Sequence, residues 1–238
     1  MDTLVKPEPT VPMACRSCRV RHGGMCEVLG PVELARLAAC SRRTRHGSGE
    51  ALAVESDAVH GYANVTRGTV KLSRVLRDGR QQLVGLQFAP DLMGRLFSSE
   101  SPLSAEAATE VELCRIPRDV LEGLVADSEG LKQRLLEQAL QDLDEAREWM
   151  VTLGRKSAVE RVASVLLLIA TRMGGRDAHG NITLDLPIGR ADMADFLGLT
   201  IETVSRQMSR LRREGVISVQ GHRCVVIHDI EALGARSG

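Results

Sequence analysis

The chain is poor in aromatic residues, shows no excess of either charge and contains no long apolar run. One Trp, one Tyr and three Phe among 238 residues leave few faces on which single-stranded nucleic acid can stack. With 31 basic and 31 acidic side chains, the chain has no general basic field. The apolar run at 162–170 is too short to cross a bilayer, and residues 1–13 lack the apolar core of a signal peptide. We therefore expect a soluble, cytoplasmic protein with no membrane partner.

The remaining composition is that of a globular protein with unevenly distributed charge. Apolar residues make up 43% and charged residues 26%, which excludes disordered and fibrous classes. The length fits one large domain or two ordinary ones. Residues 155–238 contain 12 Arg or Lys against 9 Asp or Glu, and residues 1–154 contain 19 against 22. The zero net charge thus conceals a basic C-terminal part and an acidic remainder.

The spacing of the cysteines indicates a ligand site. The six cysteines are Cys15, Cys18, Cys26, Cys40, Cys114 and Cys224. A reducing compartment argues against a disulfide framework. A close C-x-x-C pair with further cysteines is typical of iron–sulfur clusters, and tetrahedral zinc takes the same four thiolates. Cys15, Cys18, Cys26 and Cys114 are therefore candidate ligands of a 4Fe–4S cluster, with a zinc site and a thiol switch as alternatives.

The residues around the first three cysteines suit an anionic group. No acidic residue lies between Ala14 and Cys26, and the stretch contains Arg16, Arg19 and Arg21. A 4Fe–4S cluster with its four thiolates carries about two negative charges. Gly23-Gly24 gives the loop freedom to fold back, and we expect Cys114 near a strand end. We expect Cys40 and Cys224 to be buried small apolar side chains and not ligands.

Turn signals divide the first half of the chain into short segments. Residues 1–13 are predicted as a flexible tail, 14–27 as a loop and 31–40 as a helix. Four later segments are predicted as strands: 62–66, 69–76, 82–87 and 111–116. The turn signals between them are Arg67-Gly68, Asp78-Gly79 and Pro90-Asp91. This spacing predicts a small β-sandwich or barrel.

A long helical stretch follows at 119–152 and has two apolar faces. A heptad spacing of 3, 4, 3, 4, 3 relates Leu136, Ala139, Leu143, Ala146, Met150 and Leu153. A second stripe, which would face the β domain, contains Leu131, Leu135 and Gln138. Two apolar faces require two partners, which favours a homodimer seam over a helix that lies only on its own domain. The alanines bury little area, and nearby acidic residues would oppose their symmetry mates, so the seam is marginal.

The C-terminal part has the element order of a winged helix-turn-helix. The predicted helices and strands are 157–173, 182–186, 190–197, 200–213, 216–219 and 223–227. In the helix at 200–213, Thr200 is the expected N-cap. The residues expected on its buried face are Ile201, Val204, Met208 and Leu211. The residues expected on its opposite face are Glu202, Ser205, Arg206, Ser209 and Arg213.

The exposed face of this helix carries side chains that can read DNA. Arg can bind guanine with two hydrogen bonds, Glu can accept from cytosine, and Ser can meet several base edges. Phosphate contacts are expected from Arg210, Arg212 and Arg213. The alternative is a solvated amphipathic helix with ordinary surface charge. The preceding segment ADMADFLGLT, with Gly198 at the tight turn, favours the DNA-binding interpretation.

The segment ADMADFLGLTIETVSRQMSRLRREGVI resembles the DNA-binding domain of the CRP/FNR superfamily of bacterial transcription regulators. The similarity extends over nearly the whole chain and implies an α+β fold. That fold has an N-terminal double-stranded β-helix, the cyclic-nucleotide-binding-like β-roll, then a long dimerisation helix and a winged helix-turn-helix. The corresponding domains are a tail and cluster loop at 1–27, a sensor at 28–118, a dimerisation region at 119–154 and a DNA-binding domain at 155–238.

The E-x-x-S-R pattern is similar to the FNR branch, which reads TTGAT-N4-ATCAA palindromes. By that resemblance Arg206 reads the guanine, Glu202 the opposite strand and Ser205 a thymine. The four cysteines resemble the cluster ligands of FNR-type oxygen sensors, and the seven-residue gap before Cys26 resembles FnrL and FnrN relatives. The resemblance implies an oxygen-responsive homodimer that activates or represses promoters. Oxygen would convert 4Fe–4S to 2Fe–2S and loosen the dimer. RNA polymerase would contact the turn at 77–81.

The sequence departs from relatives that bind cyclic nucleotides. Gly94-Arg95 stands where those relatives have Gly-Glu for the ribose, and the phosphate-binding stretch at 99–105 contains no Arg. An acidic pocket without Arg repels a phosphodiester, so no cyclic nucleotide is expected. The chain also lacks P-loop and G-x-S-x-G motifs in context, and we expect no enzymatic activity.

Overall fold

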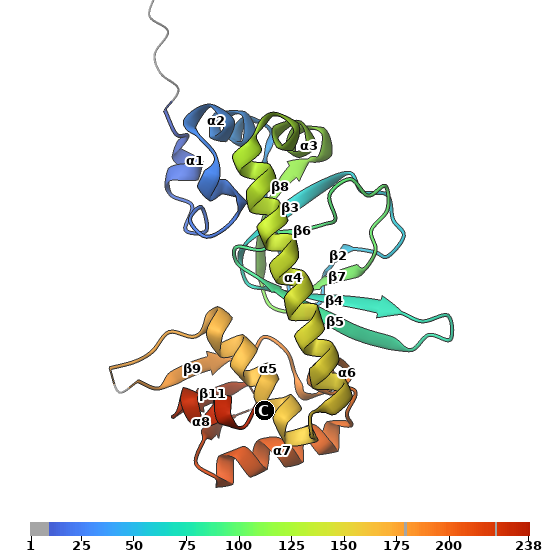
Figure 1. Ribbon diagram of the computed structural model, residues 1–238, viewed down its shortest axis with the longest axis vertical. Helices are drawn as coiled ribbons and strands as arrows, with labels where there is room; N and C mark the ends of the chain where they lie inside the picture. The colour runs from blue at the N-terminus through green and yellow to red at the C-terminus, as the bar shows by residue number, and fades with distance from the viewer. Residues whose placement is uncertain (1–9, 179, 222) are drawn as a thin grey trace, which may run out of the picture. The chain divides into compact units, whose positions relative to one another are not determined.

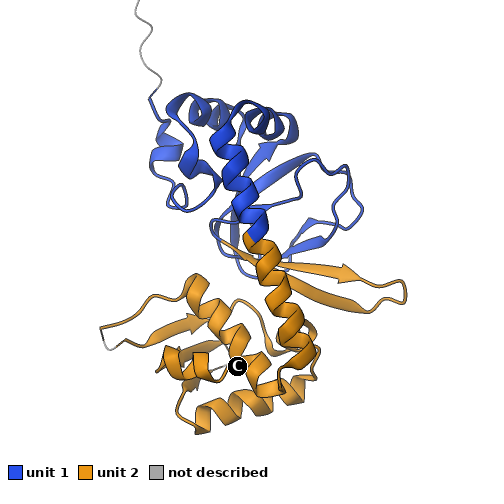
Figure 2. Ribbon diagram, viewed as in Figure 1, with its two compact units in different colours: residues 1–69, 89–140 blue, residues 70–88, 141–238 orange. Residues whose placement is uncertain are grey.

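A computed structural model of the chain describes residues 10–178, 180–221 and 223–238. These residues form two compact units (Figure 2). The first contains the residues up to Thr69 together with Ala89–Leu140. The second contains Val70–Phe88 together with Gln141–Gly238.

The elements follow the predicted order from N-terminal helices through strands to a C-terminal helical region (Figure 1). The helices are α1 Met13–Arg16, the 3-10 helix η1 Met25–Val28, α2 Pro31–Cys40, α3 Arg118–Asp127, α4 Glu129–Arg155, α5 Ala158–Met173, α6 Arg190–Leu197, α7 Ile201–Arg213 and α8 Ile230–Ala235. The strands are β1 Arg42–His46, β2 Ala51–Ala53, β3 Gly61–Arg67, β4 Thr69–Val75, β5 Gln81–Phe88, β6 Leu92–Met93, β7 Ser104–Ala107, β8 Val111–Pro117, β9 Ile182–Asp185, β10 Ile217–Gln220 and β11 Cys224–Ile227. The predicted α+β class is confirmed.

Two four-stranded sheets form the β-roll. One sheet has the order β1-β8-β3-β6, and the other has the order β2-β7-β4-β5. In the first sheet Cys114 of β8 pairs with Arg43 of β1 on one side and with Asn64 of β3 on the other. Gly68 makes the tight turn between β3 and β4 with φ +85, and a Cβ there would lie 2.2 Å from the Glu110 carbonyl oxygen. Only glycine fits such a close backbone approach.

A buried apolar cluster joins the helices of the first unit to this sheet. Its buried members are Met25, Leu29, Leu34, Leu37, Tyr62, Ile116, Leu121, Leu124, Val125 and Leu131. Burying a Leu side chain contributes about 1.5–3 kcal/mol, so the cluster fixes α2, α3 and the start of α4 against β3 and β8. Leu135 packs against the same cluster, which confirms two members of the second α4 stripe predicted to face the β domain.

The second unit contains the winged helix-turn-helix. Strands β10, β11 and β9 form a sheet in that order; α5 packs against β9, α7 packs against β10, and α6 packs against both helices. Gly198 ends α6 in the left-handed conformation with φ 59, and the Thr200 side chain accepts a hydrogen bond from the Thr203 amide as the N-cap of α7. The hairpin of β4 and β5 belongs to this unit and contacts α6 through the Lys71–Asp192 ion pair at 3.1 Å.

Further contacts fix the hairpin to α6. The Leu83 amide donates to the Asp195 carboxylate at 3.0 Å, and the Gln82 side chain donates to the Asp195 carbonyl oxygen at 2.7 Å. Burial raises the pKa of Asp195 above its ordinary value. Trp149 of α4 packs against Phe196 of α6 with ring centroids 4.5 Å apart. These contacts order α6, the helix that precedes the predicted DNA reader.

Three predicted elements are corrected by the structure. The helical stretch at 119–152 is two helices, because Ser128 adopts an extended conformation between α3 and α4. Residues 14–27 are not a plain loop, since α1 and η1 overlap the two ends of this stretch. The predicted tail also ends earlier, because Met13 begins α1; residues 1–9 of that tail lie outside the described residues.

None of the helices in the described ranges is long and apolar enough to cross a membrane.

Candidate functional site

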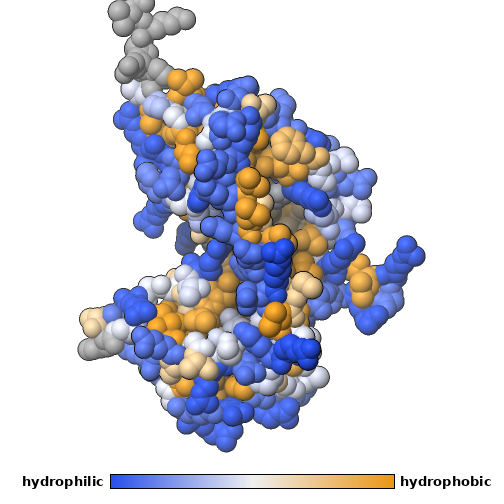
Figure 3. All heavy atoms as spheres, viewed as in Figure 1, coloured by the Kyte–Doolittle hydropathy of each residue, from blue (hydrophilic) through white to orange (hydrophobic). Residues whose placement is uncertain are grey.

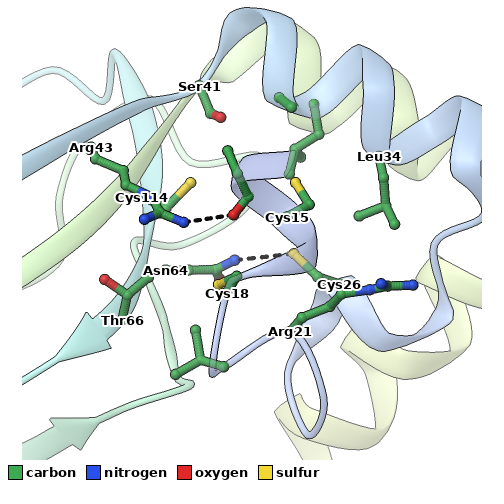
Figure 4. Close-up of a pocket in the computed structure, with 14 residues that line it drawn as sticks. Cys15, Cys18, Arg21, Cys26, Leu34, Ser41, Arg43, Asn64, Thr66 and Cys114 are labelled. Carbon is green, nitrogen blue, oxygen red and sulfur yellow. Dashed lines mark hydrogen bonds between the residues drawn. The ribbon is translucent and has the colours of Figure 1, made fainter. Parts of the chain in front are cut away.

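Four cysteines from separate elements surround one cavity in the first unit (Figure 4). Cys15 lies in α1, Cys18 in the turn after it, Cys26 in η1 and Cys114 in β8. The cavity has a volume of about 120 Å³, and their sulfur atoms point into it. We call this cavity the thiol pocket. The structure therefore brings together the four residues that sequence spacing selected as ligands.

Hydrogen bonds hold the segment that contains the first three cysteines. Arg43 of β1 donates to the Ala14 carbonyl oxygen at 2.7 Å, and Arg134 of α4 donates to the Gly23 carbonyl oxygen at 2.6 Å. A carbonyl that accepts from a charged guanidinium makes one of the stronger hydrogen bonds in a protein. The segment is therefore fixed both to the sheet and to the long helix.

The four thiols of the pocket are partly buried, and burial raises the pKa values of three of them. Burial, together with the neighbouring thiols Cys114, Cys15 and Cys18, raises the pKa of the Cys26 thiol to about 12. Burial also raises the pKa values of Cys15 and Cys114. Such thiols stay protonated until a cation takes the place of the proton, and a coordinated metal ion deprotonates a thiol outright. Cys15, Cys26 and Cys114 are therefore neutral thiols near neutral pH.

The polar lining of the pocket fits an anionic group of several atoms. Arg21 and Arg43 line it together with Asn64 and Thr66, and no carboxylate is among the lining residues. Asn64 donates to the Cys26 sulfur at 3.5 Å. The buried Arg21 Nε and Asn64 Oδ1 have no hydrogen-bond partner among the described residues.

Within the described ranges, no three His, Cys, Asp or Glu side chains form a group that could hold a metal ion.

Three expectations for single cysteines were wrong. Cys114 is the central residue of β8 and not near its end, because the β1–β8 ladder continues on both sides of it. Cys40 is exposed, since α2 turns its buried face of Leu34 and Leu37 toward the sheet and leaves its last residue outward. Cys224 is only partly buried in β11.

The residues missed by sequence reasoning are Asn64, Arg43 and Arg134. Asn64 interrupts the buried run of β3, where it stands between Ala63 and Val65. A polar residue inside an apolar strand is the signal that could have identified it. The two arginines carry no such signal, because each lies among other charged residues.

Helix α7 presents the predicted DNA-reading residues to solvent. Glu202, Ser205, Arg206, Ser209, Arg210, Arg212 and Arg213 are all exposed. Val204, Met208 and Leu211 are buried as predicted, but Ile201 is 48% exposed, because the first turn of α7 extends beyond the core that covers the later turns. Arg210 pairs with Glu214 at 2.9 Å, and Arg206 donates to the Thr203 hydroxyl.

An exposed apolar stripe runs along α4 (Figure 3). Its predicted members Leu136, Ala139, Leu143, Ala146 and Met150 are exposed, and Met150 is 72% exposed. Leu153 is half-buried. Leu140 and Val151 widen the stripe beyond the heptad positions. Exposed apolar area of this kind is usual where another protein surface binds.

Comparison with known proteins places the chain in a family. It matches the Crp-like helix-turn-helix domain over residues 160–236 and the cyclic nucleotide-binding domain over residues 43–128. It is 48% identical over 226 residues to a probable transcriptional activator of Rhizobium leguminosarum bv. viciae, with 95% of this chain and 94% of the relative covered. It is 38% identical to the transcriptional activator protein FnrL of Cereibacter sphaeroides, with 97% and 94% covered.

Further relatives agree in sequence and in structure. The nitrogen fixation regulation protein FixK of Bradyrhizobium diazoefficiens is 36% identical, with 93% of this chain and 94% of the relative covered. The structure of FixK2 from Bradyrhizobium japonicum is similar with a TM-score of 0.76 at 29% identity, over 83% of this chain and 98% of that one. The chain belongs to the CRP/FNR family of transcription regulators.

Proposed function

We propose that the chain is a cytoplasmic, oxygen-responsive transcription regulator that holds a 4Fe–4S cluster in the thiol pocket. The observation that carries this proposal is the convergence on one cavity of four thiols, three from the N-terminal segment and one from β8. A relative 38% identical over nearly the whole chain is an FnrL activator, which supports the same class.

The protein residues supply what such a cluster requires. Cys15, Cys18, Cys26 and Cys114 would provide the four thiolates, and Arg21 and Arg43 would offset the negative charge of the loaded site. When bound, the cluster supplies a redox-active centre that reacts with oxygen. Leu34 and Leu37 close the apolar side of the pocket and limit the access of water.

The pocket is connected to α4 within the first unit. Cys15 and Cys26 pack against the same apolar cluster as Leu131 and Leu135, and Arg134 binds the Gly23 carbonyl oxygen. Leu136 follows directly on the exposed side of the helix. A change in the segment that contains the cysteines therefore acts on the part of α4 where the dimer seam begins. We propose that loading of the pocket favours a homodimer through this seam.

Dimerisation would control DNA binding. A palindrome is bound strongly when two recognition helices are held at one spacing, and the exposed residues of α7 are the proposed readers of TTGAT-N4-ATCAA sites. Arg206 would contact the guanine, with Glu202 and Ser205 beside it. The exposed turn of the β4–β5 hairpin, closed by the Leu76 amide and the Arg80 carbonyl oxygen at 2.7 Å, would contact RNA polymerase. The regulator would activate or repress according to the position of its site.

One experiment separates this proposal from its alternatives. Protein purified without oxygen is analysed for iron, acid-labile sulfide and zinc, and its visible spectrum is recorded before and after air. The proposal expects about four irons and four sulfides per chain, as the cluster composition requires, with a broad visible absorption that air removes. Zinc without sulfide would contradict the proposal and favour a zinc-controlled regulator of the same fold. Absence of both metals with retained DNA binding would favour a thiol switch. Cyclic AMP added to the same protein is expected to leave DNA binding unchanged.

A further inference from the structure

Asn64 is a polar side chain in an apolar part of the sheet. Only 6% of its surface is exposed, and its neighbours in β3, Ala63 and Val65, are fully buried. An amide is costly to bury unless its donors and acceptor are bonded. An apolar residue would satisfy the sheet at lower cost, so packing alone gives no reason for an amide here.

The contacts of Asn64 lead to the thiol pocket. Its Nδ2 donates to the Cys26 sulfur at 3.5 Å, and Figure 4 shows the amide among the four thiols. Its Oδ1 is buried and has no partner among the described residues. The cross-strand neighbour of Asn64 on β8 is Cys114, another pocket thiol. The amide is thus anchored in the sheet and directed at a sulfur.

Hydrogen bonds to ligand sulfurs set the reduction potential of iron–sulfur centres. The reduced form carries more negative charge on its sulfurs, so an N–H donor stabilises it more than the oxidised form. Resting on the proposed function, we propose that Asn64 is a positioning residue whose hydrogen bond to Cys26 raises the reduction potential of the bound cluster and slows its oxidation by dioxygen. In that oxidation one electron leaves the cluster and dioxygen accepts it, becoming superoxide.

The test compares two pocket variants of the full chain, each loaded with iron and sulfide without oxygen. Asn64→Leu removes the donor at similar side-chain size. Thr66→Val is the matched control, because Thr66 lines the same cavity but its hydroxyl donates to the Glu112 carbonyl oxygen. The readouts are the midpoint potential from a dye-mediated titration and the rate at which visible absorption is lost in air.

Asn64→Leu is expected to shift the one-electron equilibrium about tenfold toward the oxidised form, which is a potential about 59 mV lower. Its absorption should decay faster in air than that of the parent, whereas Thr66→Val should match the parent in both readouts. An unchanged potential together with a lowered melting temperature of the cluster-free protein would mean that Asn64 serves only the sheet, and would overturn the inference.

Two further outcomes keep the inference separate from the proposed function. If the parent chain binds no iron and sulfide, both fail together. If the parent binds them and Asn64→Leu has the parent's potential, the inference alone fails. Should Asn64→Leu not fold, Asn64→Ala is measured in its place with the same expected direction.

Discussion

The thiol pocket and the exposed face of α7 are built in opposite ways. The pocket draws on α1, η1, β3 and β8, and its four cysteines are partly buried. The α7 face comes from one helix of thirteen residues, and all seven of its predicted DNA-reading side chains are exposed. The first site exists only when the fold has formed, whereas the second needs only a helix and its N-cap. The thiol pocket and the exposed face of α7 can therefore be altered separately in this chain.

The largest effect is expected from substitutions of the pocket cysteines, which leave the exposed face of α7 unchanged. Cys114→Ser should abolish iron–sulfur absorption, as should Cys15→Ser, Cys18→Ser and Cys26→Ser, because four thiolates are required. Cys40→Ser is the control, since Cys40 is exposed and lies outside the pocket. Visible spectra of protein loaded without oxygen provide the measurement. A complete cluster in the Cys114 variant would disprove the ligand assignment.

The next largest effect is expected from substitutions on the exposed face of α7, which leave the thiol pocket unchanged. Arg206→Ala should weaken binding to a TTGAT half-site by about 1–3 kcal/mol, roughly 5- to 150-fold, and relax selection at the guanine. Arg212→Ala should weaken matched and mismatched duplexes alike and reduce the salt dependence. Titration of both duplexes at two salt concentrations distinguishes them. Equal effects of the two substitutions on specificity would mean that α7 is oriented differently on DNA.

A third prediction concerns the helix between the two sites. Ala139→Leu with Asp142→Ala adds apolar area and removes an acidic group beside the α4 stripe, so the dimer should persist after the cluster is lost. A gain of about 1.4 kcal/mol already changes the equilibrium tenfold. Analytical ultracentrifugation of air-exposed protein measures it. A variant as monomeric as the air-exposed parent would show that this stripe is not the element under control.

The smallest effect is expected from a change at Thr200, the N-cap of α7, which alters stability and not cluster binding. Thr200→Ala removes the hydroxyl that accepts from the Thr203 amide and should lower the free energy of unfolding by about 1 kcal/mol. Thr200→Ser keeps the acceptor and should remain close to the parent. Thermal unfolding followed by circular dichroism checks both. Cluster binding should be unaffected in either variant, because the two sites lie in different units.

The sequence predicted features that depend on neighbouring residues well. It predicted features that depend on contacts between distant segments less well. The bounds of α2 and α6 and the N-cap Thr200 follow from periodicity and capping within a few residues. Cysteine spacing identified three of the thiols that share the cavity, and the family resemblance pointed to the fourth, Cys114. The place of Cys114 inside β8, and the approach of Asn64 to Cys26, depend on the register of β1, β3 and β8, which hydrophobic pattern alone does not determine. The break at Ser128 was missed because the apolar spacing continues across it.

The attachment of the β4–β5 hairpin to α6 has a consequence for the construction of hybrid regulators. An exchange made between Leu140 and Gln141 follows the unit boundary inside α4, but it separates the DNA-binding part from the hairpin with which it forms one unit. Asp192 would then lose its ion pair with Lys71, and Asp195 would depend on the backbone of a foreign hairpin for the amide that Leu83 supplies. A chimera that carries residues 70–88 along with 141–238 keeps these partners. The part to transfer into a hybrid regulator therefore consists of two separate segments of the sequence.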